Sequence, residues 1–327
     1  GGLYIPEQLL IQQIYDPLIY ADPEQNLHPG LATSWEVNPE GTEFTLNLRN
    51  DVKFHDGTPF NAQAVKVSLD RAAVGTTVAA AAPAILTDYI ETQVVNDTQV
   101  VIKFSTPHAT FLQDLTRPWL MISSPAAIEQ YGDDYGQHPV GTGPFIFKEW
   151  AAQDHITLVK NPDYNWGPEF FTHTGPALLD EIVFRVLPEA AIRLTAFQTG
   201  EALLVQDPSY LEASQMANDG STQVFTFTAP GMTSHQMINV EKAPTDDINV
   251  RKAMIYAVDQ ETIVQTAFYG LQSAAHSVIS PTTWAFNEEA NNLYRYDPKK
   301  AAELLEESGW VDTNGDGIRE KNGVNLH

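Results

Sequence analysis

The sequence predicts an α/β protein. Three segments alternate apolar and polar residues, which is the pattern of a half-buried strand. Their apolar positions are Phe44, Leu46 and Leu48, then Val100, Ile102 and Phe104, then Ile182, Phe184 and Val186. Other segments repeat apolar residues at intervals of three and four, as amphipathic helices do. Because the two patterns alternate along the chain, strands and helices belong to one mixed fold.

Length and composition fit a folded protein of two lobes. The chain has 327 residues, of which 43% are hydrophobic and 18% charged, so a hydrophobic core is expected and disorder is not. The longest apolar stretch, residues 78–86, contains Pro83 and is too short to cross a bilayer. The first residues lack the basic start and long apolar run of a signal peptide. We therefore expect any export signal to precede residue 1.

Charge and cysteine content exclude several classes of partner and site. Lys and Arg number 18 against 42 Asp and Glu, which gives a formal charge of −24. Such a surface repels phosphate backbones and anionic lipids, so nucleic acid is not an expected partner. The chain contains no cysteine, which excludes disulfides, thiolate metal sites and cysteine nucleophiles within it.

A helix is expected after Asn61, a residue type that caps helix N-termini. The helical spacing of the residues that follow gives one apolar face, formed by Ala62, Val65, Leu69 and Ala72.

A glycine-rich turn is expected before the strand that begins at Phe145. Gly141 and Gly143 flank Thr142, and glycine allows backbone angles that other residues avoid. Pro144 fixes its own φ and disfavours a helix at Gly143. The segment therefore reads as a tight turn that leads into a strand.

Two further helices are expected in the C-terminal third. Asp247 precedes Val250, Met254 and Ala257, which have helical spacing. Asp297 and Pro298 form a helix start, and Gly309 stands where that helix would end. The buried stripe of this second helix is expected to be Ala301, Leu304 and Leu305. Between the lobes, residues 226–234 are the expected crossing, because Pro230 and Gly231 interrupt a strand-like run.

No catalytic motif is present. The sequence lacks G-x-S-x-G, G-x-x-x-x-G-K and H-E-x-x-H, and its nine histidines form no pair at helical spacing. No spacing singles out a pair of carboxylates for hydrolysis. The expectation is a protein that is not an enzyme and carries no cofactor, with a hydrolase as a remote alternative.

One acidic loop resembles half of a calcium-binding loop. Asp312, Asn314 and Asp316 occupy alternate positions, but the twelfth position, normally glutamate, is Gly323. Glu320 is a candidate substitute ligand. The preferred interpretation is a polar double turn in which Asp and Asn bond their own backbone, and a weak calcium site is the alternative.

Five segments, read together, resemble one protein family in order along nearly the whole chain. They lie at residues 31–62 (LATSW, FTLNLR and VKFHDGTPFNA), 139–145 (PVGTGPF), 160–167 (KNPDYNWG), 242–259 (KAP, VRKA and YAVD) and 296–310 (YDPKKA and GW). These motifs are similar to those of the extracytoplasmic solute-binding proteins of ABC transporters, in the peptide/nickel/opine class known as family 5. One minor departure is Ala64, where the family usually has an acidic residue.

The resemblance implies a two-lobed clamp of the type II periplasmic-binding-protein fold. Lobe I would comprise residues 1–228 with an extra subdomain at about 41–159, and residues 229–327 would form the first part of lobe II. Family members are usually longer, so we expect lobe II to be incomplete here. Ligand contact with both lobes would favour the closed form.

The resemblance also implies the function. The protein would bind a small solute or peptide, act as a monomer, and deliver its ligand to an ABC permease. It would be periplasmic, or tethered outside the membrane by a lipid. A ligand sensor that signals to a receptor is the alternative, because the same fold serves both.

The expected ligand is a short peptide or similar small organic solute, with a nickel chelate second. The N-terminal segment resembles that of nickel-binding members, where Tyr4 carries over and Leu9 replaces a methionine that lines the site. The arginine that grips the chelate's carboxylates there corresponds to Leu120. Arg117 or His138 is the candidate substitute for that charge.

A loop of lobe II adds one aromatic candidate, because Trp284 follows Pro281 in a segment that could face the ligand or support the loop from within. The predicted ligand contacts are Tyr4, Leu9, Arg117, Trp119, Leu120, His138 and Trp284.

Overall fold

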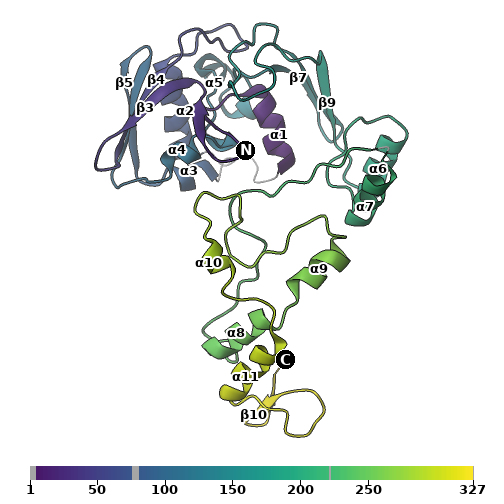
Figure 1. Ribbon diagram of the computed structural model, residues 1–327. Coiled ribbons are helices and arrows are strands. Elements are labelled where there is room, and N and C mark those ends of the chain that lie inside the picture. Colours follow the sequence, from purple (N-terminus) through teal and green to yellow (C-terminus); the bar gives the residue numbers. More distant parts are fainter. Residues whose placement is uncertain (1–4, 76–80, 221, 327) are drawn as a thin grey trace. The chain divides into compact units, whose positions relative to one another are not determined.

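The computed structural model describes residues 5–75, 81–220 and 222–326 (Figure 1). The chain divides into two compact units, Gly1–Ile192 and Arg193–His327, called unit 1 and unit 2 below. Each unit is described by itself. The expected lobe boundary at residue 228 and the expected subdomain at about 41–159 stay predictions.

The larger sheet of unit 1 has four antiparallel strands in the order β3-β4-β6-β5 (Figure 1). Their bounds are β3 (Ala32–Val37), β4 (Glu43–Leu48), β5 (Tyr89–Asn96) and β6 (Gln99–Phe104). Phe44 on β4 pairs with Ile102 on β6, and both side chains are buried. The alternating pattern predicted both of these strands correctly, because every second side chain points into the core.

Helix α2 (Ala62–Val74) packs against β5 and β6 of this sheet. Its N-cap is Asn61, as predicted, and the Asn61 side chain accepts a hydrogen bond of 3.1 Å from the Ala64 N–H. Val65 and Leu69 are fully buried in the main core of the unit, and Ala72 packs against it. The expected apolar face of this helix is therefore confirmed.

A second antiparallel sheet has the order β7-β8-β9, with β7 (Phe145–Ala151), β8 (His155–Lys160) and β9 (Glu181–Arg185). Helix α1 (Ile5–Ile14) packs on β7, and Ile14 shares a small core with Phe145 and Leu158. The expectation of a third strand through Val186 was one residue too long. β9 ends at Arg185, and the Val186 side chain is exposed.

Short elements complete unit 1. A two-stranded hairpin is formed by β1 (Ile19–Ala21) and β2 (Leu27–Pro29). The remaining helices are α3 (Ala81–Ile85), α4 (Phe111–Asp114), η1 (Pro118–Leu120), α5 (Pro125–Tyr131) and η2 (Gly132–Gln137). The two η elements are 3-10 helices.

Unit 2 consists mainly of short helices. Helix α6 (Ala190–Gln198) spans the division between the units. The helices that follow are α7 (Tyr210–Asp219), α8 (Ile248–Tyr256), α9 (Gln260–Ala267), α10 (Glu288–Asn291) and α11 (Pro298–Glu307). A small hairpin, β10 (Glu320–Lys321) and β11 (Val324–Asn325), lies near the end of the chain.

Helices α8 and α11 pack together around Ala253, Ala301 and Leu304. The predicted start of α11 is confirmed, since the Asp297 side chain accepts a hydrogen bond from the Lys300 N–H at 2.9 Å. Leu305 packs against this core as well, so the expected stripe of α11 is confirmed.

The expected face of α8 was wrong in part. Val250 is buried as predicted, but the next buried position is Ala253, while Met254 is exposed and Ala257 caps the helix end. The reason is tertiary, because α11 packs on the side of α8 that carries Ala253. A periodic pattern predicts the spacing of the buried residues along a helix, but it does not settle which residue lies at the centre of the buried face.

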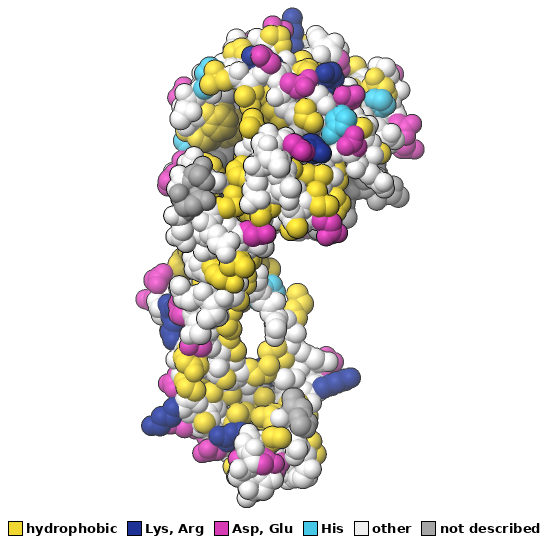
Figure 2. Space-filling model, turned by 90° about the vertical axis from the view of Figure 1, so that its right-hand side faces the viewer, with side chains coloured by type: hydrophobic (Ala, Val, Ile, Leu, Met, Phe, Trp, Pro, Cys, Tyr) yellow, Lys and Arg dark blue, Asp and Glu magenta, His cyan; other side chains and the backbone are white. Residues whose placement is uncertain are grey.

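Apolar side chains lie at the surface of unit 2, and Figure 2 shows exposed hydrophobic side chains in yellow. Phe225, Phe227 and Met237 are largely exposed. The strand-like run expected at residues 226–234 forms no strand among the described residues, and Met232 makes an isolated bridge to Ile279. Within the described part of the chain, no helix is both long and apolar enough to cross a membrane.

Candidate functional site

Two of the predicted ligand-contacting segments lie together in unit 1. Helices α1 and η1 contact each other, and Leu10 and Met121 pack on the same small core around Ile14. Leu9 lies on α1 with 40% of its surface exposed. Tyr4 falls outside the described residues. One surface of unit 1 therefore carries both the N-terminal helix and the segment that contains Arg117.

Arg117 presents a half-exposed guanidinium at the start of η1. Its Nε lies 3.2 Å from Oδ1 of Asp114, and its side chain is 51% exposed. The guanidinium carbon lies 5.8 Å from the centre of the Trp119 ring, within range of a cation–π contact. Among the described residues, none accepts a hydrogen bond from the two Nη atoms. The site thus holds a cation that is fixed on one edge.

Asp114, the partner of Arg117, is itself held firmly. Its Oδ2 accepts a hydrogen bond of 2.9 Å from the Thr110 hydroxyl and lies 3.3 Å from Nε2 of His108. The His108 ring packs edge-on against Phe104 and lies 5.5 Å from the ring of Phe111. The carboxylate is buried, so its position is set by the core and not by solvent.

Trp119 and Leu120 differ from Arg117 in accessibility. Trp119 is partly buried against the main core. Leu120 lies within that core and is 1% exposed. In this structure the Leu120 side chain packs against other apolar residues, and its predicted contact with a ligand stays a prediction.

His138 lies apart from this cluster. Its ring stacks on Tyr131, with 4.2 Å between centroids and an interplanar angle of 17°. Its N–H donates to the Tyr135 carbonyl at 2.9 Å. No hydrogen bond, ion pair or ring contact joins it to Arg117 in the described part of the chain. The two alternative sources of positive charge therefore belong to different places in unit 1.

Trp284 lies in unit 2 on an anchored loop. The hydroxyl of Thr283 accepts a hydrogen bond of 2.7 Å from the Gly231 N–H, and the hydroxyl of Thr282 donates to the Thr228 carbonyl at 3.1 Å. The Trp284 side chain is 60% exposed. The alternative of an internal aromatic support is therefore wrong for this structure, while its contact with a ligand stays a prediction.

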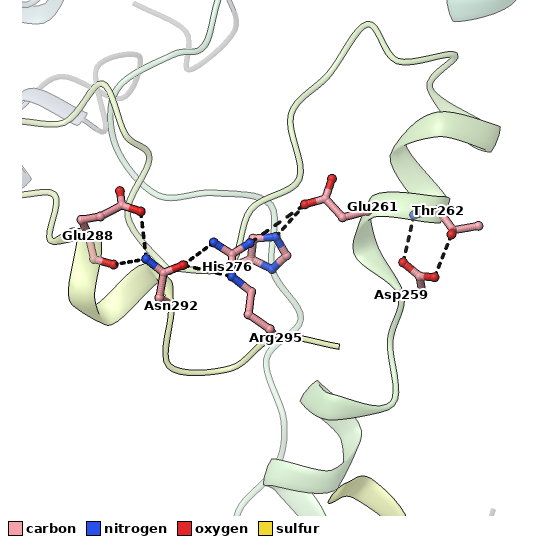
Figure 3. Close-up of polar contacts among 7 residues, drawn as sticks. All are labelled: Asp259, Glu261, Thr262, His276, Glu288, Asn292 and Arg295. Carbon is pink, nitrogen blue, oxygen red and sulfur yellow. Dashed lines mark hydrogen bonds and ion pairs between the residues drawn. The ribbon is translucent and has the colours of Figure 1, made fainter. Parts of the chain in front are cut away.

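A polar network in unit 2 joins α9 to α10 through the intervening loop (Figure 3). Glu261 lies 3.1 Å from Nε2 of His276 and 4.0 Å from Nη1 of Arg295. Arg295 donates two hydrogen bonds to Oδ1 of Asn292, which in turn donates to Glu288. His276 is 5% exposed, and its Nδ1 has no hydrogen-bond partner. No pattern in the sequence singled out this network.

A buried carboxylate connects α1 to the glycine-rich turn. Asp16, two residues after α1, is 2% exposed. Its Oδ1 accepts hydrogen bonds from the hydroxyls of Tyr20 at 2.7 Å and Tyr164 at 3.0 Å. Its Oδ2 accepts them from the Thr142 hydroxyl at 2.7 Å and from Trp166 Nε1 at 2.9 Å. Four neutral donors thus satisfy one buried carboxyl group, as burial requires.

The tyrosines of this group remain hydrogen-bond donors at neutral pH. Burial raises the pKa of both Tyr20 and Tyr164 above the ordinary value, and the nearby charge of Asp16 raises it further. The GTG motif therefore has a structural role, since its threonine anchors the turn to the segment after α1.

The two glycines of the motif are required by close contact. A Cβ atom on Gly141 would lie 2.2 Å from the Ile14 carbonyl oxygen, and one on Gly143 would lie 2.6 Å from the Ile14 carbonyl carbon. Neither glycine has a left-handed φ. The expectation that these positions need unusual backbone angles is corrected accordingly.

His55 completes the support of this turn. Its Nε2 lies 3.0 Å from the Gly143 carbonyl oxygen, and its N–H donates to the Gly141 carbonyl at 2.9 Å. Burial lowers the pKa of His55, so the neutral ring, with its proton on Nε2, fits this contact. Nδ1 has no hydrogen-bond partner.

The acidic loop of unit 2 has the geometry of a double turn. Asp312 accepts hydrogen bonds from the N–H groups of Gly315 and Gly317, at 2.7 and 2.9 Å. Asn314 and Asp316 accept from backbone N–H groups two residues further on, and Glu320 accepts from the Thr313 N–H. No three or more His, Asp or Glu side chains among the described residues are arranged to hold a metal ion.

Two open depressions mark the surface of unit 1, and neither includes Arg117. The first, about 270 Å³, lies on the second sheet and is lined by charged residues such as His155, Asp154 and Glu149. The second, about 380 Å³, is lined in part by His108 and Asp114. Asp114, which pairs with Arg117, and His108, which contacts Asp114, therefore line the second depression, although Arg117 itself does not.

The sequence suggested Arg117 as a candidate ligand contact, which stays a prediction, but not the residues that contact Arg117 in the structure. No sequence pattern pairs Asp114 or His108 with Arg117, and their proximity follows from the packing of α4 on the sheet, where Phe111 contacts Phe44 and Phe104. Asp16 was missed for the same reason, since its partners lie up to 150 residues away.

Comparison with known proteins gives a family match over nearly the whole chain. Residues 26–326 match the family described as bacterial extracellular solute-binding proteins, family 5 Middle. The glutathione-binding protein GsiB of Shigella flexneri serotype 5b is 32% identical over 310 residues, which cover 93% of this chain and 57% of that protein. The nickel-binding periplasmic protein of Escherichia coli K12 is 31% identical over 331 residues, which cover 99% and 61%.

Solved structures agree with the sequence matches. NikA from Brucella suis in complex with Fe(III)-EDTA superposes with a TM-score of 0.79 at 28% identity, covering 99% of this chain and 64% of that one. DppA from Helicobacter pylori, an ABC transporter-associated periplasmic binding protein in complex with the peptide STSA, gives 0.70 at 28%, covering 91% and 60%. The predicted α/β fold of the two-lobed binding-protein class is confirmed. The chain spans about three fifths of the length of these relatives.

Proposed function

The chain belongs to family 5 of the bacterial extracellular solute-binding proteins, and on this premise we propose that it captures a short peptide or similar small organic solute and delivers it to an ABC permease. The names of the compared relatives describe binding proteins. We propose likewise that the protein works as a monomer outside the cytoplasm, in the periplasm or tethered to the membrane, and that it makes and breaks no bond.

The observation that carries the peptide assignment is the guanidinium of Arg117. A free peptide ends in a carboxylate, and a guanidinium binds carboxylates through paired, charge-assisted hydrogen bonds. Arg117 is half exposed and fixed by Asp114 on one edge. The ring of Trp119 beside it offers an apolar surface for a side chain of the solute.

A nickel chelate is the second candidate. One relative is named a nickel-binding periplasmic protein, and NikA from Brucella suis was solved with Fe(III)-EDTA. Arg117 suits this ligand as well, because a chelated metal would be held through the carboxylates of its chelator. Leu120 stands where the resemblance places the arginine of nickel-binding members, which ranks the chelate after the peptide.

Calorimetry of the full-length protein tests the assignment. It is titrated with a mixture of di- to pentapeptides and, separately, with nickel–histidine. We expect heat of binding with the peptides and a weaker or no response with nickel–histidine. Tight binding of nickel–histidine without any response to peptides would reverse the order of the two candidates.

Two variants test the predicted contacts. Arg117→Gln is expected to weaken binding roughly tenfold or more, because one charge-assisted hydrogen bond contributes about 1.5–3 kcal/mol. Tyr4→Ala is expected to weaken it as well if that side chain lines the site. Undiminished affinity in either variant removes the substituted residue from the proposed site.

A further inference from the structure

We infer that Asp114 is a positioning residue for Arg117 and that, through Arg117, it makes the solute site selective for ligands with a free carboxylate. This inference rests on the proposed function and specifies its ligand class. It starts from the ion pair between the two side chains, which lies at the Nε edge of the guanidinium.

Asp114 occupies only one edge of the Arg117 guanidinium. The guanidinium carries five N–H donors in a planar fork, and the contact with Asp114 is through Nε, 3.2 Å from Oδ1. The Nη atoms donate to no described residue, and the side chain is 51% exposed. The Nη1–Nη2 edge is therefore the part of the fork that remains for an external carboxylate.

The Asp114 carboxylate is held in a fixed position by its other contacts. Its other oxygen, Oδ2, is engaged by the Thr110 hydroxyl and lies beside Nε2 of His108. The backbone is fixed too, since the Asp114 N–H donates to the Thr110 carbonyl at 2.9 Å and the Arg117 N–H donates to the Asp114 carbonyl at 3.1 Å. Oδ1 is thus presented to Arg117 from a rigid turn.

Trp119 limits the guanidinium from a second direction. The guanidinium carbon lies 5.8 Å from the centre of the ring. Together, the ion pair at Nε and the ring contact restrict the rotation of a side chain that would otherwise move freely at the surface. A preorganised guanidinium loses less conformational entropy when it binds a ligand.

The competing interpretation is an ordinary ion pair between neighbouring turns. Exposed pairs of this kind contribute little to stability. This pair differs because one partner is buried and engaged by two further side chains while the other is exposed. A structural pair affects folding alone, whereas a positioning pair affects which ligands are bound.

The test compares two ligand sets on the full-length protein. The probes are a mixture of di- to pentapeptides and the same mixture with C-terminal amides, each titrated by calorimetry. The variants are Asp114→Asn, Arg117→Gln and the double variant. Glu303→Gln is the matched control, because Glu303 belongs to an i,i+3 ion pair with Lys300 in unit 2. Urea unfolding of each variant separates lost binding from lost folding.

We expect the wild type and Glu303→Gln to prefer the free acids about tenfold or more, the range of one charge-assisted hydrogen bond. Asp114→Asn and Arg117→Gln should each reduce that preference to a few-fold, and the double variant should lose no more than Arg117→Gln alone. A variant Asp114→Asn that weakens acids and amides equally, or that keeps the full preference, overturns the inference.

Two further results separate the inference from the proposed function. A wild type that binds acids and amides equally leaves the peptide function standing and overturns the role of Asp114. If the wild type binds neither mixture, the peptide function fails, and the positioning is judged by NMR. There, the Arg117 side chain should be ordered in the wild type and more mobile on the ps–ns timescale in Asp114→Asn, and unchanged mobility overturns the positioning.

Discussion

The hydroxyl of Thr142 donates a hydrogen bond of 2.7 Å to the buried carboxyl group of Asp16, 126 residues earlier in the chain. This contact joins the glycine-rich turn to the segment after α1, which is the helix that carries Leu9. The geometry of the proposed solute site therefore depends on a polar contact in the interior of unit 1.

Replacing Thr142 by valine is expected to destabilise the protein by about 1–3 kcal/mol, because the shape is kept while the buried Oδ2 of Asp16 loses one of its two hydrogen-bond donors. Thr142→Ser is the control, since it keeps the hydroxyl and loses one methyl group, worth about 1 kcal/mol. Urea unfolding followed by circular dichroism measures both. A serine variant less stable than the valine variant would contradict the role of the hydroxyl.

Gly141→Ala is expected to destabilise unit 1 by about 1–3 kcal/mol or more, since the new Cβ would meet the Ile14 carbonyl oxygen at 2.2 Å and the core resists such overpacking. Gly136→Ala is the matched control. A Cβ there would meet no atom within 4 Å, and its φ is not left-handed, so its stability should change little. Equal unfolding midpoints for the two variants would refute the close-contact explanation.

The lowered pKa of His55 predicts that the protein loses stability in mild acid. Burial lowers the pKa of His55 in the folded protein, so its contribution is present above the unfolded value of about 6.5 and is lost as the pH falls towards the folded value. His55→Gln removes the titration and keeps an N–H donor for the Gly143 carbonyl. Unfolding midpoints at pH 7.5 and 5.5 should differ less in this variant than in the wild type, and an equal difference would exclude His55 as the cause.

The raised pKa of His155 predicts the opposite dependence of stability on pH. Hydrogen bonding to Asp154, and then to Glu149, raises the pKa of His155, so its contribution is present below about 6.5 and is lost as the pH rises through the folded value. NMR titration of the imidazole should show a lower pKa in Asp154→Asn. The control is Asp133→Asn, a change of an exposed aspartate that does not contact His155, and it should leave the titration unchanged. A pKa unaffected by Asp154→Asn would show that the carboxylate is not responsible.

Local patterns in the sequence determined the strands and helix starts that are stabilised by interactions within a few residues of the chain. Alternation predicted the strands through Phe44 and Ile102, because a strand exposes one face to the core whatever lies behind it. Asn61 and Asp297 marked the starts of α2 and α11, because an N-cap satisfies N–H groups within its own first turn. The ordered motifs also predicted the family, which the match over residues 26–326 confirms.

Only the tertiary structure decided which side chains meet. The buried face of α8 centres on Ala253 and not on Met254 because α11 packs there. Gly141 is required because another segment passes within contact distance, which its neighbours in sequence do not reveal. Asp114 acquires its proposed role from His108, Thr110 and Arg117 together. Such contacts depend on how distant segments are packed, and no local pattern encodes that packing.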